Sequence, residues 1–388
     1  MIKINKNLLN VQQVDNFEEV SRRVNEYKIN NPNNKLLNLG VGDVSKPIIK
    51  EVIDEMNKAI NELGNIDTFK GYGYFYGHSF LKKKIIDEYN CFTEEEIYIS
   101  DGAKTDTTNI LELFDKDSLA CLFNPSYPVY RDALDIMGIK YEYIDANEFN
   151  DFRPLPNKKY DIVYICSPSN PLGIAYDKDY LTKWVKYALK NNCIILYDNV
   201  YDSFIRSSNV PKTIYEIEGS KKIAIEFRSY SKKASFTGVR CSYYIIPNEL
   251  IIKDVNKYWK KRVMTKFNGS DYIAQRGALA TYSNKSIIKI NKNIDDYLTN
   301  ARYIKEELEK LNYKVYGGFD SPYLWIKNKN NMSSWNFFDL FLNELNIIVI
   351  PGIVFGTNGD NYFRVSALAN KSVIYEAIER IKSYEKEN

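Results

Sequence analysis

The most informative segment of this 388-residue chain reads Ser229-Tyr230-Ser231-Lys232-Lys233-Ala234-Ser235-Phe236-Thr237-Gly238-Val239-Arg240. It lies between two apolar runs, residues 223–229 and 241–247, that are typical of strands. A lysine among small hydroxyl residues, followed eight positions later by an arginine, suits a phosphate-bearing aldehyde. Hydroxyls and a guanidinium can hold the phosphate while the amine forms a Schiff base. A surface hairpin with ordinary charges is the alternative that these residues leave open.

Apolar runs elsewhere in the chain predict the sheet to which this segment belongs. They lie at residues 96–100, 119–124, 139–144, 161–167, 193–198, 223–229 and 241–247. Helical patterns alternate with them, such as residues 177–191 and residues 46–63, where Pro47 suits a first helical turn. This alternation predicts an α/β fold with a largely parallel sheet that is covered on both faces. Ligands of such sheets bind at the carboxyl ends of the strands.

The pattern changes after residue 248. Long helices are expected near residues 248–263, 271–283 and 286–311, and strands near residues 323–327, 347–350 and 362–366. We therefore predict an N-terminal arm (1–45) that forms part of a small domain, a large domain (46–284) and a small C-terminal domain (285–388).

Composition excludes several classes of protein. Lys and Arg number 53 against 50 Asp and Glu, a balance that argues against a dedicated nucleic-acid binder. The sequence has no run of about eighteen apolar residues and no signal-peptide core at residues 1–6, so we expect a soluble cytoplasmic protein. The five cysteines are scattered and suit no metal site. The single histidine, His78, is assigned to structure or surface, which leaves proton transfer to another group.

Asp198 and Tyr201 follow the apolar run at residues 193–197. A carboxylate in that place can pair with a protonated pyridine nitrogen, and a tyrosine three residues later can bond to a phenolic oxygen. An ordinary helix cap or turn is the alternative for the aspartate.

Two turns follow other strands. Residues 100–105 read Ser-Asp-Gly-Ala-Lys-Thr, and the N–H groups of Ala103 and Lys104 at a helix start suit a phosphate. Residues 167–173 read Ser-Pro-Ser-Asn-Pro-Leu-Gly and include Asn170. An Asp N-cap explains the first segment equally well, and a generic tight turn explains the second.

Arg364 lies inside the apolar strand pattern Tyr-Phe-Arg-Val-Ser at residues 362–366. A buried guanidinium needs an anion, and its fork matches a substrate α-carboxylate. A salt bridge to an internal Asp or Glu is the alternative.

Together these motifs resemble the fold-type-I pyridoxal-phosphate aminotransferases of class I/II, whose signature Ser-x-Ser-Lys-x-x-small-apolar-x-Gly-x-Arg matches residues 229–240. Cys241-Ser242 replaces a more typical apolar-Gly pair, which we expect to affect packing rather than chemistry. The resemblance implies pyridoxal 5'-phosphate on Lys232, with Lys232, Asp198 and Tyr201 as catalytic residues. It implies cofactor contacts by Tyr72, Ala103, Lys104, Tyr127, Asn170, Asp198, Tyr201, Ser229, Ser231, Lys232 and Arg240.

Within this superfamily the chain is most similar to the LL-diaminopimelate aminotransferases. The similar segments are residues 4–8, 22–26, 39–43, 71–73, 100–104, 227–240 and 266–269. The resemblance implies lysine biosynthesis, LL-diaminopimelate and 2-oxoglutarate as substrates, and a homodimer in which Tyr72 reaches the neighbour's phosphate. It implies substrate contacts by Asp15, Gly42, Phe75, Lys104, Tyr127, Asn170, Asn268 and Arg364.

Two positions depart from the family. Asp15 replaces a tyrosine, and Tyr74-Phe75-Tyr76 replaces Pro-Glu-Gln, which removes a carboxylate expected to bind the distal ammonium. An unpaired buried ammonium costs on the order of 1–3 kcal/mol. Either Asp15 compensates, or the substrate is another amino acid with an apolar, aromatic or differently charged tail. Other reactions of the same cofactor and a non-catalytic, aminotransferase-like binding protein are further alternatives. Arg364 favours transamination over decarboxylation because it stabilises a charged carboxylate.

Overall fold

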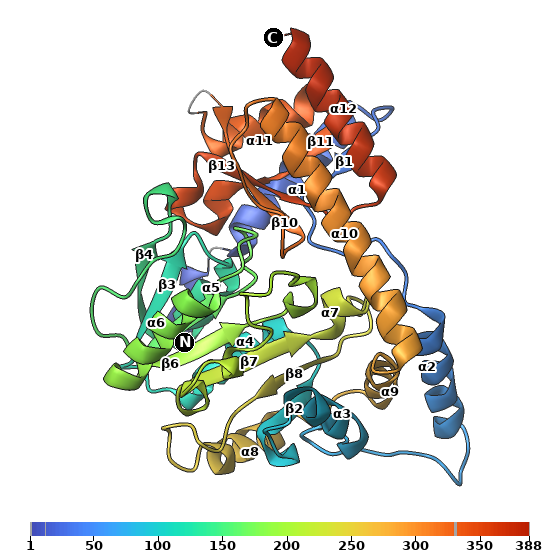
Figure 1. Ribbon diagram of the computed structural model, residues 1–388, viewed down its shortest axis with the longest axis vertical. Helices are drawn as coiled ribbons and strands as arrows, with labels where there is room; N and C mark the ends of the chain where they lie inside the picture. Colours follow the sequence, from blue (N-terminus) through green and yellow to red (C-terminus); the bar gives the residue numbers. More distant parts are fainter. Residues whose placement is uncertain (1, 12, 330–331, 388) are drawn as a thin grey trace.

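The computed structural model describes residues 2–11, 13–329 and 332–387, and it contains a seven-stranded sheet in the order β2-β8-β7-β6-β5-β3-β4 (Figure 1). Its strands are β2 (Ile97–Ser100), β3 (Leu119–Asn124), β4 (Lys140–Asp145), β5 (Ile162–Cys166), β6 (Ile194–Asp198), β7 (Ala224–Ser229) and β8 (Ser242–Ile245). Only β8 runs antiparallel to its neighbours in this sheet of described residues. The predicted, largely parallel α/β sheet is confirmed.

Both faces of this sheet are covered, which is why its central strands are apolar without alternation. Val163 of β5 packs into a core with Trp184, and the next residue, Tyr164, packs into a different core with Trp259. The helices between and beside the strands are α2 (Lys50–Leu63), α3 (Ser79–Tyr89), α4 (Ala103–Asn109), α5 (Pro128–Met137), α6 (Lys178–Asn191), α7 (Tyr230–Lys233), α8 (Val255–Lys266) and α9 (Tyr272–Ala280).

Two predicted helix starts are wrong. Helix α2 begins at Lys50, so Pro47 precedes it, because the N–H groups of Ser45 and Lys46 donate to the hydroxyl of Tyr297 and hold this segment outside the helix. Helix α8 begins at Val255 rather than near residue 248, since Asp254 adopts a left-handed conformation with φ of +56°.

A second sheet contains four antiparallel strands in the order β12-β13-β10-β9. They are β9 (Val315–Gly317), β10 (Tyr323–Lys327), β12 (Ile350–Pro351) and β13 (Tyr362–Ser366), accompanied by α10 (Asn284–Lys310), α11 (Ser334–Asn343) and α12 (Lys371–Glu387). The predicted strand at residues 347–350 is divided at Val349, because β11 (Ile347–Ile348) pairs with a different partner.

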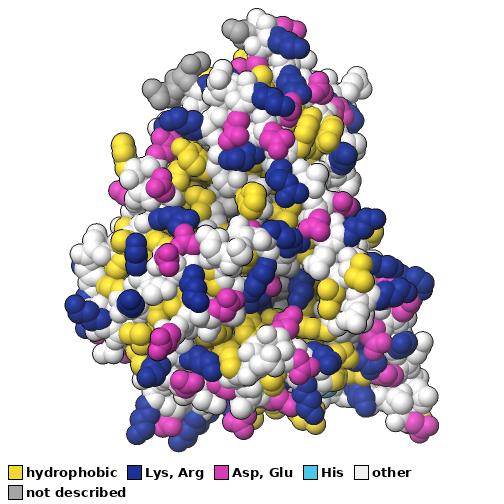
Figure 2. All heavy atoms as spheres, in the orientation of Figure 1, with side chains coloured by type: hydrophobic (Ala, Val, Ile, Leu, Met, Phe, Trp, Pro, Cys, Tyr) yellow, Lys and Arg dark blue, Asp and Glu magenta, His cyan; other side chains and the backbone are white. Residues whose placement is uncertain are grey.

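That partner is β1 (Leu37–Asn38), which follows α1 (Gln13–Asn30). Segments from the two ends of the chain therefore lie side by side above the large sheet (Figure 1). The bounds of the three predicted parts stay a prediction. On the face drawn in Figure 2, basic and acidic side chains are interspersed. No helix in the described ranges is long and apolar enough to cross a membrane.

Candidate active site

A cavity of about 440 Å³ lies where the carboxyl ends of several sheet strands meet β13 and the segment after β1. Most of the residues singled out from the sequence line it. They are Gly42, Ala103, Lys104, Tyr127, Asn170, Asp198, Tyr201, Ser229, Ser231, Lys232, Arg240 and Arg364. Their individual roles stay predictions, and the contacts below show what each can do.

Lys232 lies in the single-turn helix α7, which starts where the Ser229 hydroxyl accepts a hydrogen bond from the N–H of Ser231. Its Nζ atom donates to the carbonyl oxygen of Gly42. Burial lowers the pKa of Lys232 to about 8, an effect that Arg364 and Arg240 reinforce and that a nearby aspartate opposes. More of this amine is neutral near pH 8 than in a surface lysine, as a nucleophile requires.

Arg240 lies at one end of the cavity, near Ser231. Its Nη1 atom lies 3.4 Å from the Ser231 hydroxyl and 3.3 Å from the carbonyl oxygen of Thr237. Gly102 makes room for this guanidinium, because a Cβ atom there would lie 1.9 Å from Nη2 of Arg240. Arg240 and the hydroxyls of Ser229 and Ser231 therefore form an end of the cavity that suits a phosphate.

Asp198 ends β6, and the hydroxyl of Tyr130 donates to its Oδ2 atom. Its buried Oδ1 atom has no hydrogen-bond partner among the described residues. Burial raises the pKa of Asp198 to about 6, against the lowering effects of the Tyr130 hydroxyl and of the Val200 backbone N–H. A carboxylate oxygen that is buried and unpaired in a cavity suits a protonated ring nitrogen, so these residues fit pyridoxal phosphate.

Arg364 lies on β13. Its Nη1 atom donates to Asn170 Oδ1 at 2.7 Å, and Nη2 donates to the carbonyl oxygen of Gly40 at 2.7 Å. Its guanidinium carbon lies 4.4 Å from the ring centroid of Tyr323. Among the described side chains no carboxylate pairs with Arg364, so the internal salt bridge that the sequence left open is not found there. Its charge is available to a ligand carboxylate.

Similarity to known proteins shows the family to which the chain belongs. Residues 34–381 match the family model described as aminotransferase class I and II. The chain belongs to this aminotransferase family.

Individual relatives agree with this assignment. The chain is 43% identical to an LL-diaminopimelate aminotransferase of Methanosphaera stadtmanae, with 99% of each chain covered. It is 43% identical to one of Azobacteroides pseudotrichonymphae, with 98% of each covered. The solved L,L-diaminopimelate aminotransferase of Chlamydomonas reinhardtii matches with a TM-score of 0.92 at 33% identity, over 99% of this chain and 98% of that one. The predicted family and the fold-type-I architecture are confirmed.

Three predicted site residues of this aminotransferase lie outside the cavity, all in two neighbouring segments. Tyr72 is 89% exposed, Asn268 is exposed, and Phe75 lines a separate cavity of about 300 Å³. The segments touch each other, since a Cβ atom on Gly269 would lie 2.8 Å from the carbonyl oxygen of Tyr74. Asp15 lies within α1, and its side chain is outside those that the structure describes.

The sequence analysis missed several residues of the site. Tyr130 bonds to Asp198, Tyr323 bonds to Tyr201 through their hydroxyls at 2.9 Å, and Asp43 acts electrostatically on Lys232. Further lining residues are Phe17, Val41, Thr107, Cys166, Val200 and Thr237. Tyr130 lies three positions after Tyr127 at the start of α5, a helical spacing that could have placed both on one side. The other residues carry no such signal.

Ser242, which departs from the family pattern, takes part in a buried polar cluster. Its hydroxyl donates to Asp106 Oδ2 at 2.7 Å, and the Ser100 hydroxyl donates to Oδ1 at 2.5 Å. Burial raises the pKa of Asp106 to about 7, while both serines act to lower it. Ser242 therefore contributes a hydrogen bond to the packing around α4.

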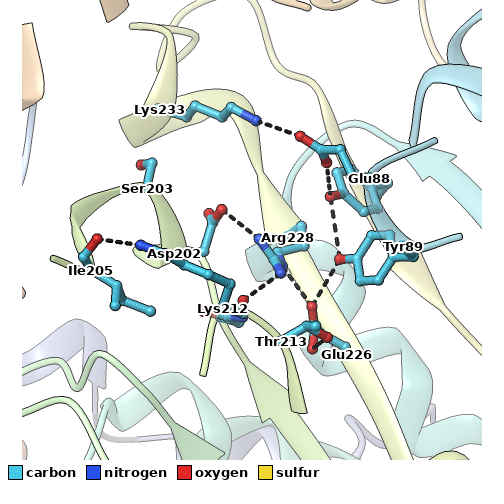
Figure 3. A network of polar contacts seen from close by, with 12 residues as sticks. Glu88, Tyr89, Asp202, Ser203, Ile205, Lys212, Thr213, Glu226, Arg228 and Lys233 are labelled. Atoms are coloured by element: carbon cyan, nitrogen blue, oxygen red, sulfur yellow. Dashed lines mark hydrogen bonds and ion pairs between the residues drawn. The ribbon is translucent and has the colours of Figure 1, made fainter. Parts of the chain in front are cut away.

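A network of buried charges connects the backbone next to Tyr201 with the backbone next to Ser229 (Figure 3). Arg228 pairs with Asp202, and its Nε atom donates to Glu226 Oε1 at 2.6 Å. Successive side chains of a strand point to opposite faces, so Arg228 points away from the face that Ser229 presents to the cavity. The ion pairs join the turn after β6 to β7 behind the site.

Proposed function

We propose that this aminotransferase carries pyridoxal 5'-phosphate on Lys232 and transfers the amino group of LL-diaminopimelate to 2-oxoglutarate, a reaction of lysine biosynthesis. The main observation behind this proposal is one cavity in which the Lys232 amine, with its lowered pKa, meets Asp198, Arg240 and Arg364. The names of the relatives support the choice of substrate.

Different residues of the cavity would bind different parts of the cofactor. When bound, pyridoxal phosphate supplies an aldehyde carbon that bonds to amines and a ring that withdraws electrons from the substrate's Cα. Arg240, Ser229 and Ser231 would hold the phosphate, and Asp198 would accept a hydrogen bond from the ring nitrogen. Tyr201 donates to the ring oxygen, and its own bond to the Tyr323 hydroxyl orients it.

Arg364 and Lys232 act on the amino acid. The Arg364 fork binds the α-carboxylate and keeps it charged, which disfavours its loss as carbon dioxide. With the cofactor and an amino acid bound, the free Nζ atom of Lys232 would serve as the base and acid that moves the proton away from the substrate's Cα. Its lowered pKa suits both proton steps near pH 8. This role of Lys232 accounts for a site without histidine.

The working unit in this proposal is a homodimer. Tyr72, which is exposed in the single chain, would reach the phosphate end of the partner's cavity. The neighbouring segments that hold Phe75 and Asn268 would lie at the same interface. A large exposed tyrosine beside exposed Phe69 and Tyr74 supports such an interface.

The distal end of the substrate separates two versions of the proposal. Phe75 supplies aromatic surface where the family has a carboxylate, so a donor with an apolar or aromatic tail is the second candidate. Under the first version Asp15 provides the missing charge, and Asp15→Ala lowers turnover of LL-diaminopimelate by about tenfold or more while leaving aromatic donors unaffected.

A panel of amino donors with 2-oxoglutarate tests the substrate. Half-reactions with LL-diaminopimelate, lysine, glutamate, phenylalanine and tyrosine are followed by the absorbance of the bound cofactor. The proposal predicts the highest kcat/KM for LL-diaminopimelate. A higher value for phenylalanine or tyrosine would replace it with the second candidate, and equal activity of Asp15→Ala on LL-diaminopimelate would remove the role of Asp15.

A further inference from the structure

Tyr130 makes one of the contacts in this site that the family motifs did not predict. The residue is 1% exposed, and its hydroxyl donates to Oδ2 of Asp198. Burial and the nearby carboxylate raise the pKa of Tyr130 well above its ordinary value, so the hydroxyl keeps its proton and acts as the donor.

The ring of Tyr130 is held on two sides. It stacks on Tyr164 with a centroid separation of 4.4 Å and an interplanar angle of 10°, and Tyr127 meets it edge-on at 5.5 Å. Tyr164 is itself fixed, because its hydroxyl donates to the carbonyl oxygen of Thr107 at 2.7 Å. The Tyr130 hydroxyl therefore has little freedom to leave Asp198.

The two oxygens of Asp198 differ as a consequence. Oδ2 is occupied by Tyr130, whereas the buried Oδ1 atom has no hydrogen-bond partner in the described part of the chain. Asp198 is a residue of the cavity wall. A hydrogen bond to one oxygen fixes the rotation of the carboxylate about its last torsion, which is otherwise broad. It also favours the charged form of the group.

We infer that Tyr130 is a positioning residue that holds Asp198 charged and turned so that Oδ1 serves the ring nitrogen of the cofactor. This inference rests on the proposed function, because it requires that the ligand be a pyridine bearing a phosphate. Tyr130 acts on Asp198 and not on the ligand. Removing the Tyr130 hydroxyl should therefore weaken the binding of a ligand that carries the ring nitrogen more than the binding of one that lacks it.

The test compares pyridoxal phosphate with a carbocyclic analogue in which C–H replaces the ring nitrogen. Dissociation constants are measured by absorbance and fluorescence titration of the cofactor-free protein, without any turnover. Tyr130→Phe is expected to weaken binding of pyridoxal phosphate by about tenfold, the effect of losing one hydrogen bond to a charged group. Binding of the analogue is expected to change by less than about twofold, so the selectivity between the ligands falls.

Tyr98→Phe is the matched control, since it removes a buried hydroxyl from another stacked tyrosine pair, Tyr98 and Tyr244, which lies outside the cavity. Its selectivity should equal that of the unmodified chain. Tyr130→Met, which lacks both ring and hydroxyl, should lose the same selectivity as Tyr130→Phe, whatever it does to overall affinity. In an Asp198→Asn background the Tyr130→Phe change should have no further effect on selectivity.

The outcomes separate the inference from the proposed function. If the unmodified chain fails to bind pyridoxal phosphate, the proposed function is wrong and the inference falls with it. If the unmodified chain binds pyridoxal phosphate but Tyr130→Phe keeps its selectivity, or weakens both ligands equally, the inference alone is overturned.

Discussion

The Nζ atom of Lys232 donates a hydrogen bond to the carbonyl oxygen of Gly42, a residue 190 positions earlier in the chain. This contact joins the turn after β7 to the segment after β1. Gly42 is confined there, because a Cβ atom on it would lie 2.3 Å from the Tyr323 hydroxyl. The surroundings of the reactive amine therefore depend on segments from both halves of the chain.

The pH dependence of cofactor capture follows from this burial. The neutral amine is the nucleophile, and burial lowers the pKa of Lys232 to about 8. The rate at which the cofactor-free protein captures pyridoxal phosphate should rise with pH and level off above an apparent pKa near 8. Stopped-flow absorbance between pH 6 and about pH 11.5 measures it. A midpoint near 10.5, the ordinary value for lysine, would show that Lys232 is not perturbed.

Arg364→Lys should raise KM for amino donors by about tenfold or more. A lysine cannot reproduce the fork that meets a carboxylate with two hydrogen bonds. Steady-state kinetics with LL-diaminopimelate measure the effect. Arg380→Lys on α12, outside the cavity, is the matched control and should leave KM unchanged. An unaltered KM in Arg364→Lys would show that Arg364 does not bind the substrate's carboxylate.

Arg228→Leu should lower the free energy of unfolding by about 3–5 kcal/mol, because it leaves Asp202 and the fully buried Glu226 without their cation. Urea denaturation of the cofactor-free protein measures this loss. Arg22→Leu removes exposed ion pairs on α1 and should lower the free energy of unfolding far less than Arg228→Leu does. Equal losses of unfolding free energy in the two variants would mean that the buried ion pairs of Arg228 contribute no more to stability than exposed ones.

Hybrid dimers test whether Tyr72 acts across an interface. Lys232→Ala and Tyr72→Ala chains should each be nearly inactive alone. Mixed after mild dissociation, they should regain activity, because one site of each hybrid receives an intact Lys232 and an intact Tyr72. A hybrid separated by affinity tags should show about half the activity of the unmodified dimer. No recovery on mixing would contradict a shared site.

Local patterns in the sequence predicted the elements that depend on neighbouring residues. The apolar runs of β3 and β6 and the periodicity of α6 are examples, since burial on both faces or on one helical face leaves a direct trace in the sequence. The predicted start of helix α2 at residue 46 was wrong for the opposite reason. Tyr297, about 250 positions away, binds the N–H groups of that segment, and no local pattern reports it.

The site divides in the same way. Lys232 and Arg240 belong to one short motif, and Asp198 follows a recognisable strand, so their types and spacing indicated their chemistry. Tyr130 is marked in the sequence only by its helical spacing from Tyr127, and Tyr323 is distinguished from the other tyrosines only by the packing of β10 against the cavity. Contacts between distant segments select these residues, and such contacts leave no signal in a single sequence.

Chemical trapping on lysine is the most direct test of the account. The protein is loaded with pyridoxal phosphate, reduced with borohydride so that any cofactor–lysine bond becomes permanent, digested and mapped by mass spectrometry. We predict that the cofactor is found on Lys232, that Lys233 next to it is unmodified, and that Lys232→Ala abolishes the modification. Cofactor fixed to Lys233 or another lysine, or none fixed by a protein that binds it, would contradict the account.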